Sequence, residues 1–381
     1  MSISKVVRNC PFRPDLANRV KRILLLSAGV MFLAGTTSAE ILIWSDEFET
    51  GPGLDASVWS YDLGDGCASG ICGWGNNEFQ VYTSDPANVR VEGGKLIITA
   101  LRQTVNGPND PGPDSYTFTS ARVKTQNNLA IQYGSIEARI QLPDLADGLW
   151  PAFWTLGTNI TGVGWPACGE IDIFEMGSAA SIADGVVNRR VGSTAHWDIA
   201  GQYAGYGLTY TSPTDLNGSY HIYRMEWTPT YISTYIDGNW VWTMDISNPQ
   251  RFSGEEFHQS HFLILDLAVG GNYTGITGAS SNITAPFPAE YRVDWIRVYD
   301  NSFANLSGAA APITLNVSRA DSDVELSFAT QTGLTYEVLY KTDITDTSWN
   351  LLQDVEGDGS RKSVYDPVGS VAGFYLVEVR R

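Results

Sequence analysis

The sequence is poor in basic side chains. Its 381 residues include 24 Lys and Arg against 42 Asp and Glu, a formal net charge of −18. Six of the basic residues and one acid lie before residue 40, so removing that segment would leave 18 basic and 41 acidic residues, or −23. Because such a surface repels phosphate, nucleic acid and anionic membranes are excluded as favoured partners, and polyanionic substrates are disfavoured.

Outside its first 39 residues the chain also lacks a long apolar segment with the 3.6-residue period of a helix. Short alternating runs recur instead, as at 95–100, 134–140 and 231–236, separated by Gly, Pro, Asn and Asp turns. The region 40–300 is therefore predicted to be all-β, a two-sheet sandwich or jelly roll.

Residues 1–39 have the pattern of a signal peptide. A basic region ends at Lys21-Arg22, an apolar run follows over 23–34, and small residues lead to a cleavage site after Ala39. A membrane anchor is the alternative, but the run is too short to span a bilayer comfortably. No cysteine follows the run, which argues against a lipoprotein. The mature chain is predicted to be secreted or periplasmic, without membrane insertion.

Cysteines are few, and one of the four lies in the leader. Cys67 and Cys72 are five residues apart in a Gly-rich segment, which favours a small disulfide loop over two unrelated buried thiols. Cys168 has no obvious partner and no histidine beside it in sequence. We interpret it as a wall residue and not as a nucleophile.

A chain of this length exceeds the usual single core, so a second folded unit is expected. Residues 301–312 are small and polar and are predicted to be a linker. Residues 313–381 again show alternating runs, typical of a small immunoglobulin-like or fibronectin-like β-sandwich. A carbohydrate-binding role and a spacer or anchoring role both remain open for this accessory domain.

Three acids stand among apolar residues in the segment EIDIFE. Burying an ion without a partner is costly, so Glu170, Asp172 and Glu175 need a reason to be there. Helical spacing would spread them around the axis, and a regular strand would turn Glu175 away from the other two. A β-bulge after Asp172 would return Glu175 to their face. We therefore predict a bulged strand with three carboxylates on one side of a cleft.

Two carboxylates in a cleft can cleave a glycosidic bond, and the retaining reaction needs them about 5–5.5 Å apart. Trp150, Trp154 and Trp165 lie just upstream, and indole rings suit the apolar faces of sugars, although each could equally be a core residue. A structural calcium cluster on the strand is the alternative interpretation of the acids.

Region 41–300 resembles glycoside hydrolase family 16 and, within it, the laminarinase-like β-1,3-glucanases. The resemblance rests on ordered motifs: WSDEF at 44–48, GWGNNE at 73–78, SARVKT at 120–125, YGSIEAR at 133–139, WPAFW at 150–154, WPACGEIDIFE at 165–175, AHW at 195–197, DG at 237–238, LAVGG at 267–271 and VDW at 293–295. It implies a concanavalin-like β-jelly-roll with an open cleft and a reaction that retains configuration.

On the family pattern Glu170 is the nucleophile, Glu175 the general acid/base, and Asp172 helps to keep their pKa values apart. Catalysis needs no cofactor. The resemblance further implies a substrate-binding set of five residues: Asn76, Trp150, Trp154, Trp165 and His196. For His196 a structural role remains equally open.

The resemblance also implies a structural calcium held by the carboxylate of Asp294 and backbone oxygens near Glu47 and Gly93. Two residues depart from the family pattern. Phe174 stands at the bulge, where laminarinases often have Met, and should alter the cleft floor little. Asp266 stands where Asn is more usual, and nothing in the sequence explains it.

The predicted protein is a monomeric, secreted endo-hydrolase of β-1,3-glucan, with mixed-linkage β-1,3-1,4-glucan as a second substrate. An endo-hydrolase of another β-linked polysaccharide, such as agarose or carrageenan, is the alternative enzyme. A non-catalytic β-glucan-binding protein is the alternative of a different class, although such a protein would lack one or both glutamates.

Overall fold

The computed structural model describes residues 41–49, 51–107, 113, 115–248, 256–308, 315–320, 323–330, 335–342, 345–346, 348–358, 360–367 and 373–380. The predicted signal peptide and residues 309–312 of the predicted linker lie outside the described residues.

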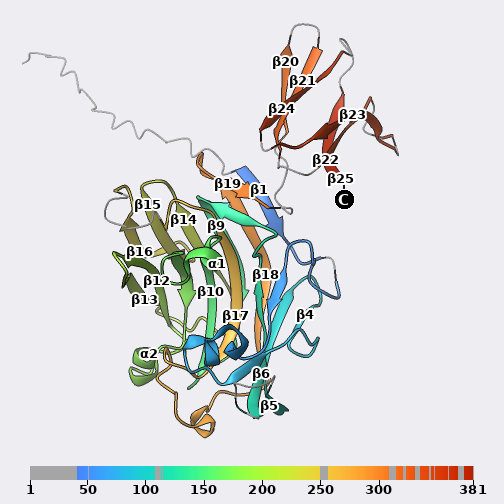
Figure 1. Ribbon diagram of the computed structural model, residues 1–381. Helices are drawn as coiled ribbons and strands as arrows, with labels where there is room; N and C mark the ends of the chain where they lie inside the picture. Colours follow the sequence, from blue (N-terminus) through green and yellow to red (C-terminus); the bar gives the residue numbers. More distant parts are fainter. Residues whose placement is uncertain are drawn as a thin grey trace, which may run out of the picture. The chain divides into compact units, whose positions relative to one another are not determined.

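Two sheets make up the region 41–308, and their strands are antiparallel except for the parallel pair β3 (Gln80–Tyr82) and β6 (Ser115–Ser120) at one end of the first sheet (Figure 1). The first sheet runs in the order β16 (Asn239–Asp245), β15 (Tyr231–Ile236), β14 (Tyr220–Trp227), β9 (Gly134–Gln141), β18 (Ala289–Asp300), β5 (Leu96–Asn106), β6 and β3, with β1 (Ile41–Asp46) beside β18 and β4 (Val89–Val91) beside β5. The second runs in the order β13 (Gln202–Thr211), β12 (Arg190–Ile199), β11 (Glu170–Glu175), β10 (Leu149–Gly157), β17 (His261–Val269), β7 (Arg122–Lys124) and β2 (Ser60–Asp62), with β8 (Ala130–Gln132) joining β17 to β19 (Asn305–Ser307).

Helices are short and lie in the connections: α1 (Ile160–Val163), α2 (Ala179–Ala183) and the 3-10 turns Cys67–Ser69, Cys72–Gly75 and Ser280–Asn282. The absence of helical periodicity in the sequence therefore predicted the fold class correctly, and the architecture is a jelly roll.

The core lies between the two sheets because their strands alternate. On β9, Ile136, Ala138 and Ile140 are fully buried while the residues between them reach the surface. They join Phe153 of β10 and Leu265 of β17 in one large apolar cluster. The side of the second sheet that points away from this cluster is called the outer face below.

Strand β11 contains the predicted bulge. Asp172 pairs with Trp154 of β10 and Phe174 pairs with Phe153, so Ile173 is the extra residue. The β12 side shows the same register shift between Asp172 and Glu175. The bulge is thus confirmed, but it does not lie at Phe174.

Phe174 points into the core and not to the floor of a cleft. Its ring centroid lies 4.0 Å from that of Tyr223 on the first sheet, and Tyr291 of the same sheet meets it edge-on. Only the placement of Phe174 at the bulge is corrected; its side chain fills the space between the sheets, which agrees with the prediction that it alters the cleft floor little.

Beyond residue 315 the described strands form two further sheets, β20 (Asn316–Ala320), β21 (Asp323–Ala329) and β24 (Arg361–Asp366), and β23 (Asn350–Glu356), β22 (Thr335–Lys341) and β25 (Phe374–Arg380). They share a small core of their own around Leu326, Phe328, Tyr336 and Val338. Within the predicted linker, Asn305–Ser307 is a strand of the second sheet, paired with β8. The first folded region thus continues past residue 300.

Both cysteine predictions can be compared with the structure. Cys67 and Cys72 form a disulfide, as expected. Cys168 is a buried free thiol packed against Leu156 and Phe262, and burial raises its pKa to about 12. A thiol that keeps its proton is a poor nucleophile, which agrees with a wall residue.

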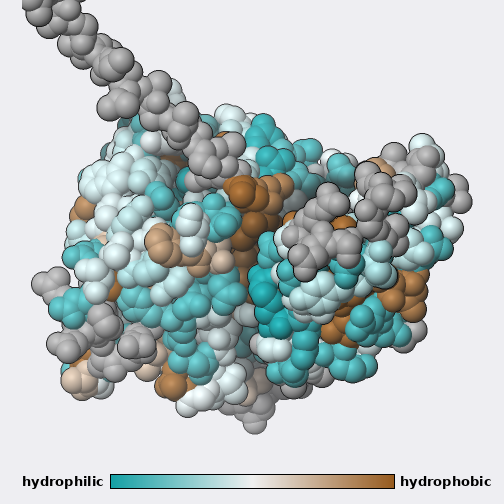
Figure 2. Space-filling model, turned by 90° about the horizontal axis from the view of Figure 1, so that it is seen from above, coloured by the Kyte–Doolittle hydropathy of each residue, from teal (hydrophilic) through white to brown (hydrophobic). Residues whose placement is uncertain are grey.

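In the part of the chain that the structure describes, no helix is long and apolar enough to cross a membrane. The face seen in Figure 2 is mostly hydrophilic or neutral, with separate hydrophobic patches.

Candidate active site

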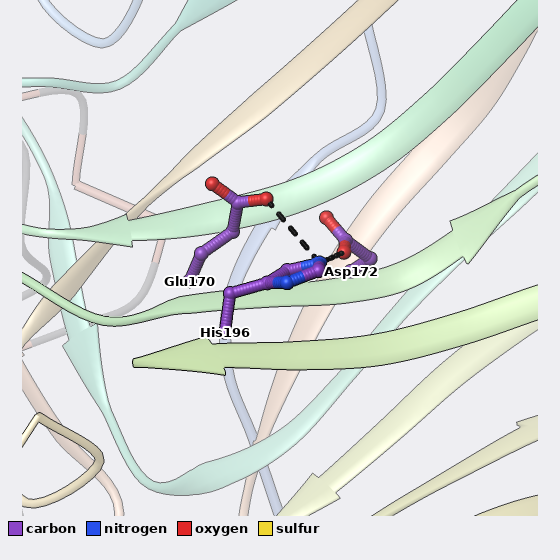
Figure 3. A group of neighbouring side chains, drawn as sticks. All are labelled: Glu170, Asp172 and His196. Atoms are coloured by element: carbon purple, nitrogen blue, oxygen red, sulfur yellow. Dashed lines mark hydrogen bonds and ion pairs between the residues drawn. The ribbon is translucent and has the colours of Figure 1, made fainter. Parts of the chain in front are cut away.

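Strand β11 brings the three predicted carboxylates together on the outer face. Glu170 and Glu175 stand at the two ends of the strand and Asp172 between them. His196 of β12 lies directly across from Glu170 in register. Figure 3 shows Glu170, Asp172 and His196 converging from these two neighbouring strands.

Each carboxylate lies within hydrogen-bonding distance of a ring nitrogen, and the two glutamates accept from tryptophan N–H groups. Trp165 Nε1 donates to Glu170 Oε2 at 2.8 Å, and Trp150 Nε1 donates to Glu175 Oε1 at 2.9 Å. His196 Nε2 lies 3.0 Å from Asp172 Oδ2 and 3.8 Å from Glu170 Oε1. These contacts hold each acid in one orientation without neutralising it.

Burial and mutual repulsion raise the proton affinity of all three acids. Burial, then the charge of Asp172, raises the pKa of Glu170 to about 8 and that of Glu175 well above its usual range. Burial, then the charge of Asp266, raises the pKa of Asp172 to about 8. At neutral pH the three therefore cannot all be ionised.

The two glutamates share most of the contacts that set their pKa values. Burial, then the charge of Asp172, raises the pKa of Glu175 well above its usual range, which favours its protonated form. His196 and a Trp N–H favour the ionised form of both glutamates, and the charge of Arg122 is a further cause that favours ionised Glu170. Once Asp172 is protonated, its charge no longer opposes ionisation of Glu170. Protonation of Asp172 and of one glutamate would leave the other glutamate ionised on the same face.

Glu170, Asp172 and His196 could also suit a metal ion, since one potential ligand atom of each lies within 4.8 Å of the others. However, the N–H of Trp165 points at Glu170, and an N–H donor would be repelled by a cation bound there. The donor set thus fits the hydrogen-bonding pattern of an acid–base site better than a metal site.

A second cluster of acids lies beside Trp154. Trp154 Nε1 donates to Asp266 Oδ1 at 2.7 Å, and the hydroxyl of Tyr82 lies 3.1 Å from Asp266 Oδ2 and 3.2 Å from Glu78 Oε2. Gln80 donates to the same Glu78 oxygen at 2.6 Å. Burial, then the charge of Asp266, raises the pKa of Glu78 to about 7.

Arg122 of β7 connects this cluster to the aromatic residues. Its guanidinium carbon lies 4.6 Å from the ring centroid of Trp154 and 4.8 Å from that of Trp74. Its Nε pairs with Asp62 at 2.9 Å. The guanidinium is therefore held between two indoles, and its charge lowers the pKa of Glu78, Asp266 and Glu170.

Residues 75–296, more than half of the chain, match the family model described as Glycosyl hydrolases family 16. The chain belongs to glycoside hydrolase family 16.

Similar proteins support this membership. The clotting factor G alpha subunit of Tachypleus tridentatus is 35% identical over 262 residues, which cover 68% of this chain and 34% of that protein. Glucan endo-1,3-beta-glucosidase A1 of Niallia circulans is 34% identical over 267 residues, 68% of this chain and 37% of the relative. The chain thus matches about a third of the length of these two relatives. The laminarinase catalytic domain from Thermotoga maritima MSB8 is 37% identical with a TM-score of 0.59, covering 69% of this chain and 98% of that domain.

Most of the residues predicted for the family 16 site lie together. Trp150, Trp165 and His196 contact the three carboxylates directly, and Trp154 pairs with Asp172 across the β10–β11 ladder. Asn76 lies beside the second acid cluster, where its Nδ2 donates a hydrogen bond to Glu78 at 3.3 Å. Asn76 therefore belongs with the second acid cluster and does not touch the β11 acids through any hydrogen bond that we find among the described residues.

The residues of the predicted calcium site do not fit a calcium ion. The Asp294 carboxylate pairs with Arg139 and lies 3.3 Å from Lys95 Nζ, which also donates to the carbonyl of Gly93 at 3.3 Å. The Glu47 side chain accepts two hydrogen bonds from Arg297, each at 2.9 Å. A lysine ammonium thus bridges Asp294 and Gly93, and a divalent cation there would be repelled by it.

Several residues that contact the predicted site residues were not predicted from the sequence. Tyr273 stacks on Trp150 with 4.9 Å between ring centroids, and its hydroxyl donates to the backbone oxygen of Glu175 at 3.3 Å. Arg122 and Glu78 lie inside two of the motifs on which the family resemblance rests, but no role in the site was predicted for either residue. The acidic residue at 266, unexplained from sequence, accepts from both Trp154 and Tyr82.

We predict that Asp266→Asn stabilises the protein in a pH-dependent way. Glu78 has a raised pKa, so its contribution to stability is complete below pH 4.5 and is lost as pH rises through 7. Removing the Asp266 charge lowers that pKa and reduces the loss. Relative to the wild type, the stability of Asp266→Asn should therefore rise between pH 5 and pH 8 by on the order of 1 kcal/mol, or about 2–4 °C in Tm.

Thermal unfolding at the two pH values measures this difference. Asp215→Asn is the matched control, because it removes the same charge at a side chain that is 69% exposed. An Asp266→Asn gain that is equal at pH 5 and pH 8, or that Asp215→Asn reproduces, would contradict the prediction.

Proposed function

We propose that the chain is a retaining endo-hydrolase of β-1,3-glucan. The observation that carries the proposal is the bulge at Ile173, which places Glu170 and Glu175 on one face, where burial raises the pKa of both. The names of one relative and of one solved structure, an endo-1,3-beta-glucosidase and a laminarinase, support β-1,3-glucan as the substrate class.

In the proposed mechanism Glu170 and Glu175 have separate roles. Ionised Glu170 attacks the anomeric carbon while protonated Glu175 gives its proton to the leaving oxygen. A covalent glycosyl ester on Glu170 results. Glu175, now ionised, takes a proton from the water that hydrolyses the ester, so configuration is retained and both acids return to their starting states.

Asp172 affects the pKa values of Glu170 and Glu175. It is 3% exposed, and its charge raises the pKa of both glutamates. We propose that Asp172 holds a proton when Glu170 is ionised and shares it through hydrogen bonding with its neighbours. His196 then stabilises whichever of Asp172 and Glu170 carries the negative charge.

The substrate proposal rests on the aromatic residues and on net charge. Trp150, Trp154 and Trp165 would stack against glucosyl rings, and Trp165 is 53% exposed beside Glu170. The net charge of −18 disfavours sulfated galactans such as carrageenan. Mixed-linkage β-1,3-1,4-glucan is proposed as a second substrate.

Export also belongs to the proposal. The leader pattern over residues 1–39 predicts a secreted or periplasmic enzyme, which suits a substrate too large to enter a cell. A monomer without membrane insertion is expected. Sedimentation and N-terminal sequencing of the exported protein would test the oligomeric state and the cleavage site.

Incubation with laminarin, lichenan, agarose and carrageenan, followed by sizing of the products, tests the substrate. We expect rapid shortening of laminarin to mixed oligosaccharides, slower cleavage of lichenan, and intact agarose and carrageenan. If agarose is cut while laminarin stays intact, the glucan assignment is wrong and the family assignment stands.

A glucan-binding protein without activity is the second candidate. One relative is a clotting-factor subunit, so the family contains members whose names describe no hydrolysis. Both glutamates are present here, which favours the enzyme. Tight laminarin binding with no product after long incubation would favour the binding protein instead.

A further inference from the structure

Tyr203, on strand β13, makes a contact that the proposed mechanism does not use. Its hydroxyl lies 2.9 Å from Nδ1 of His196, on the side of the imidazole opposite to Asp172. The Tyr203 ring stacks on the imidazole with 5.7 Å between centroids and an interplanar angle of 25°. It also lies 5.5 Å from the ring of Trp165, the residue that donates to Glu170.

Gly205 makes this contact possible. It is the residue directly across from His196 in the β12–β13 ladder, whereas Tyr203 pairs with Asp198. A Cβ on Gly205 would lie 2.7 Å from the Tyr203 hydroxyl oxygen and 3.1 Å from His196 Nδ1. The Tyr203 side chain therefore reaches across the space that the missing side chain leaves open.

The two nitrogens of His196 have different neighbours, and this fixes its tautomer. Nε2 faces Asp172 Oδ2 at 3.0 Å and Glu170 Oε1 at 3.8 Å, so it serves as a donor whenever either acid is ionised. Several side chains make a polar contact with His196 in the described structure. Of these, only Tyr203 lies at Nδ1. A phenol donates well to an imidazole lone pair, so the Tyr203 O–H selects the Nε2–H tautomer.

Tyr203 keeps its proton in this setting. Burial, then the charges of Glu170, Asp172 and Glu175, raises the pKa of its hydroxyl. The groups facing His196 are thus two acids from β11, one phenol from β13, and the ring of Trp165. Only the phenol can supply a proton to Nδ1.

We propose that Tyr203 is a positioning residue that holds His196 in the Nε2–H tautomer, aimed at Asp172 and Glu170, and that forms with Trp165 an aromatic wall for the sugar beside Glu170. The proposal rests on the proposed function for the sugar and for the roles of the acids. The tautomer assignment rests on the contacts of His196 alone.

Two variants separate the hydroxyl from the ring. Tyr203→Phe keeps the ring and removes the donor, so kcat on laminarin should fall by about 3- to 10-fold, the range expected for one lost hydrogen bond, with KM nearly unchanged. Tyr203→Ala removes the wall as well, so KM should also rise. Gly205→Ala should act like Tyr203→Phe, because the new methyl group takes the place of the hydroxyl.

The decisive readout is the tautomer of His196, obtained from the 15N shifts of its ring in a long-range 1H–15N spectrum and assigned with a His196→Gln variant. The wild-type protein should show the Nε2–H form, and Tyr203→Phe a mixture of both forms. Tyr206→Phe is the matched control on the same strand, since that ring packs edge-on against Trp242 and away from His196.

An unchanged tautomer in Tyr203→Phe, or an unchanged kcat and pH profile in both Tyr203→Phe and Gly205→Ala, would overturn the proposal. A wild-type protein that cleaves none of the four polysaccharides would overturn the proposed function instead. The ring spectrum would then still decide whether Tyr203 positions His196.

Discussion

Glu170→Gln is expected to lower kcat on laminarin by about 10⁴-fold or more, the scale of loss when a catalytic nucleophile is removed. The amide keeps the shape of the side chain and the Trp165 contact but cannot form the glycosyl ester. Substrate binding should survive. Initial rates of reducing-sugar release, together with calorimetric binding of a laminari-oligosaccharide, measure both effects.

Glu92→Gln is the matched control, because that side chain is 66% exposed and far in sequence from β11. It should leave the rate unchanged. A stronger test of the role is Glu170→Ala with added azide and an aryl β-laminaribioside. The anion should attack from the face that Glu170 occupied and yield an α-glycosyl azide. A β-azide, or Glu170→Gln activity within tenfold of wild type, would remove Glu170 from the nucleophile role.

Glu175→Gln is expected to lower kcat on laminarin by about 10²–10⁴-fold, the usual contribution of a general acid. The loss should shrink on a dinitrophenyl glycoside, whose leaving group needs no proton. Because the raised pKa of Glu175 keeps it protonated, activity of the wild type should fall as pH rises through that pKa. In the variant this alkaline fall should disappear. Rates measured on both substrates between pH 5 and 10 test the prediction.

With Glu175→Ala, azide should give a product of retained, β configuration, since it replaces water in the second step. Equal losses on laminarin and on the dinitrophenyl glycoside would mean that Glu175 does not protonate the leaving group. An alkaline limb that persists unchanged would lead to the same conclusion, because another group would then supply the proton.

The bulge on β11 could be predicted from the sequence because only one backbone irregularity brings Glu170, Asp172 and Glu175 to one face. The identity of the extra residue could not. Ile173 and Phe174 are both apolar, and they are 2% and 0% exposed, so the hydrophobic pattern does not distinguish them. The register against Phe153 on the neighbouring strand decides the matter.

Contacts between strands that are far apart in the sequence could not be predicted from it. Tyr82 and Asp266 are 184 residues apart, and their hydrogen bond follows from the order of strands in the two sheets. Tyr203 was missed for a related reason: it is neither in an acidic motif nor beside a Trp in sequence. The signal that could have found it is the pattern of Tyr203 followed two residues later by Gly205, across a hairpin from His196.

Asp266 stands where the family usually has Asn, and the structure shows the contacts of this acid. Asp266 accepts from both Trp154 and Tyr82. An Asn could accept from Trp154 through its oxygen but would have to donate its amide N–H to the Tyr82 oxygen. The charge of Asp266, however, raises the pKa of Glu78 and Asp172. A residue two strands away from Glu170 thus influences the protonation of the β11 acids.

Trapping the covalent intermediate tests the division of labour on β11 most directly. A 2-deoxy-2-fluoro laminaribiosyl fluoride should react once and stay bound, because fluorine at C2 destabilises the oxocarbenium-like transition state for hydrolysis while fluoride leaves readily. Mass spectrometry of the peptides should find the sugar on Glu170, with Asp172 and Glu175 unmodified. A sugar attached to Glu175 or Asp172, or a reagent that turns over without labelling any residue, would contradict the account.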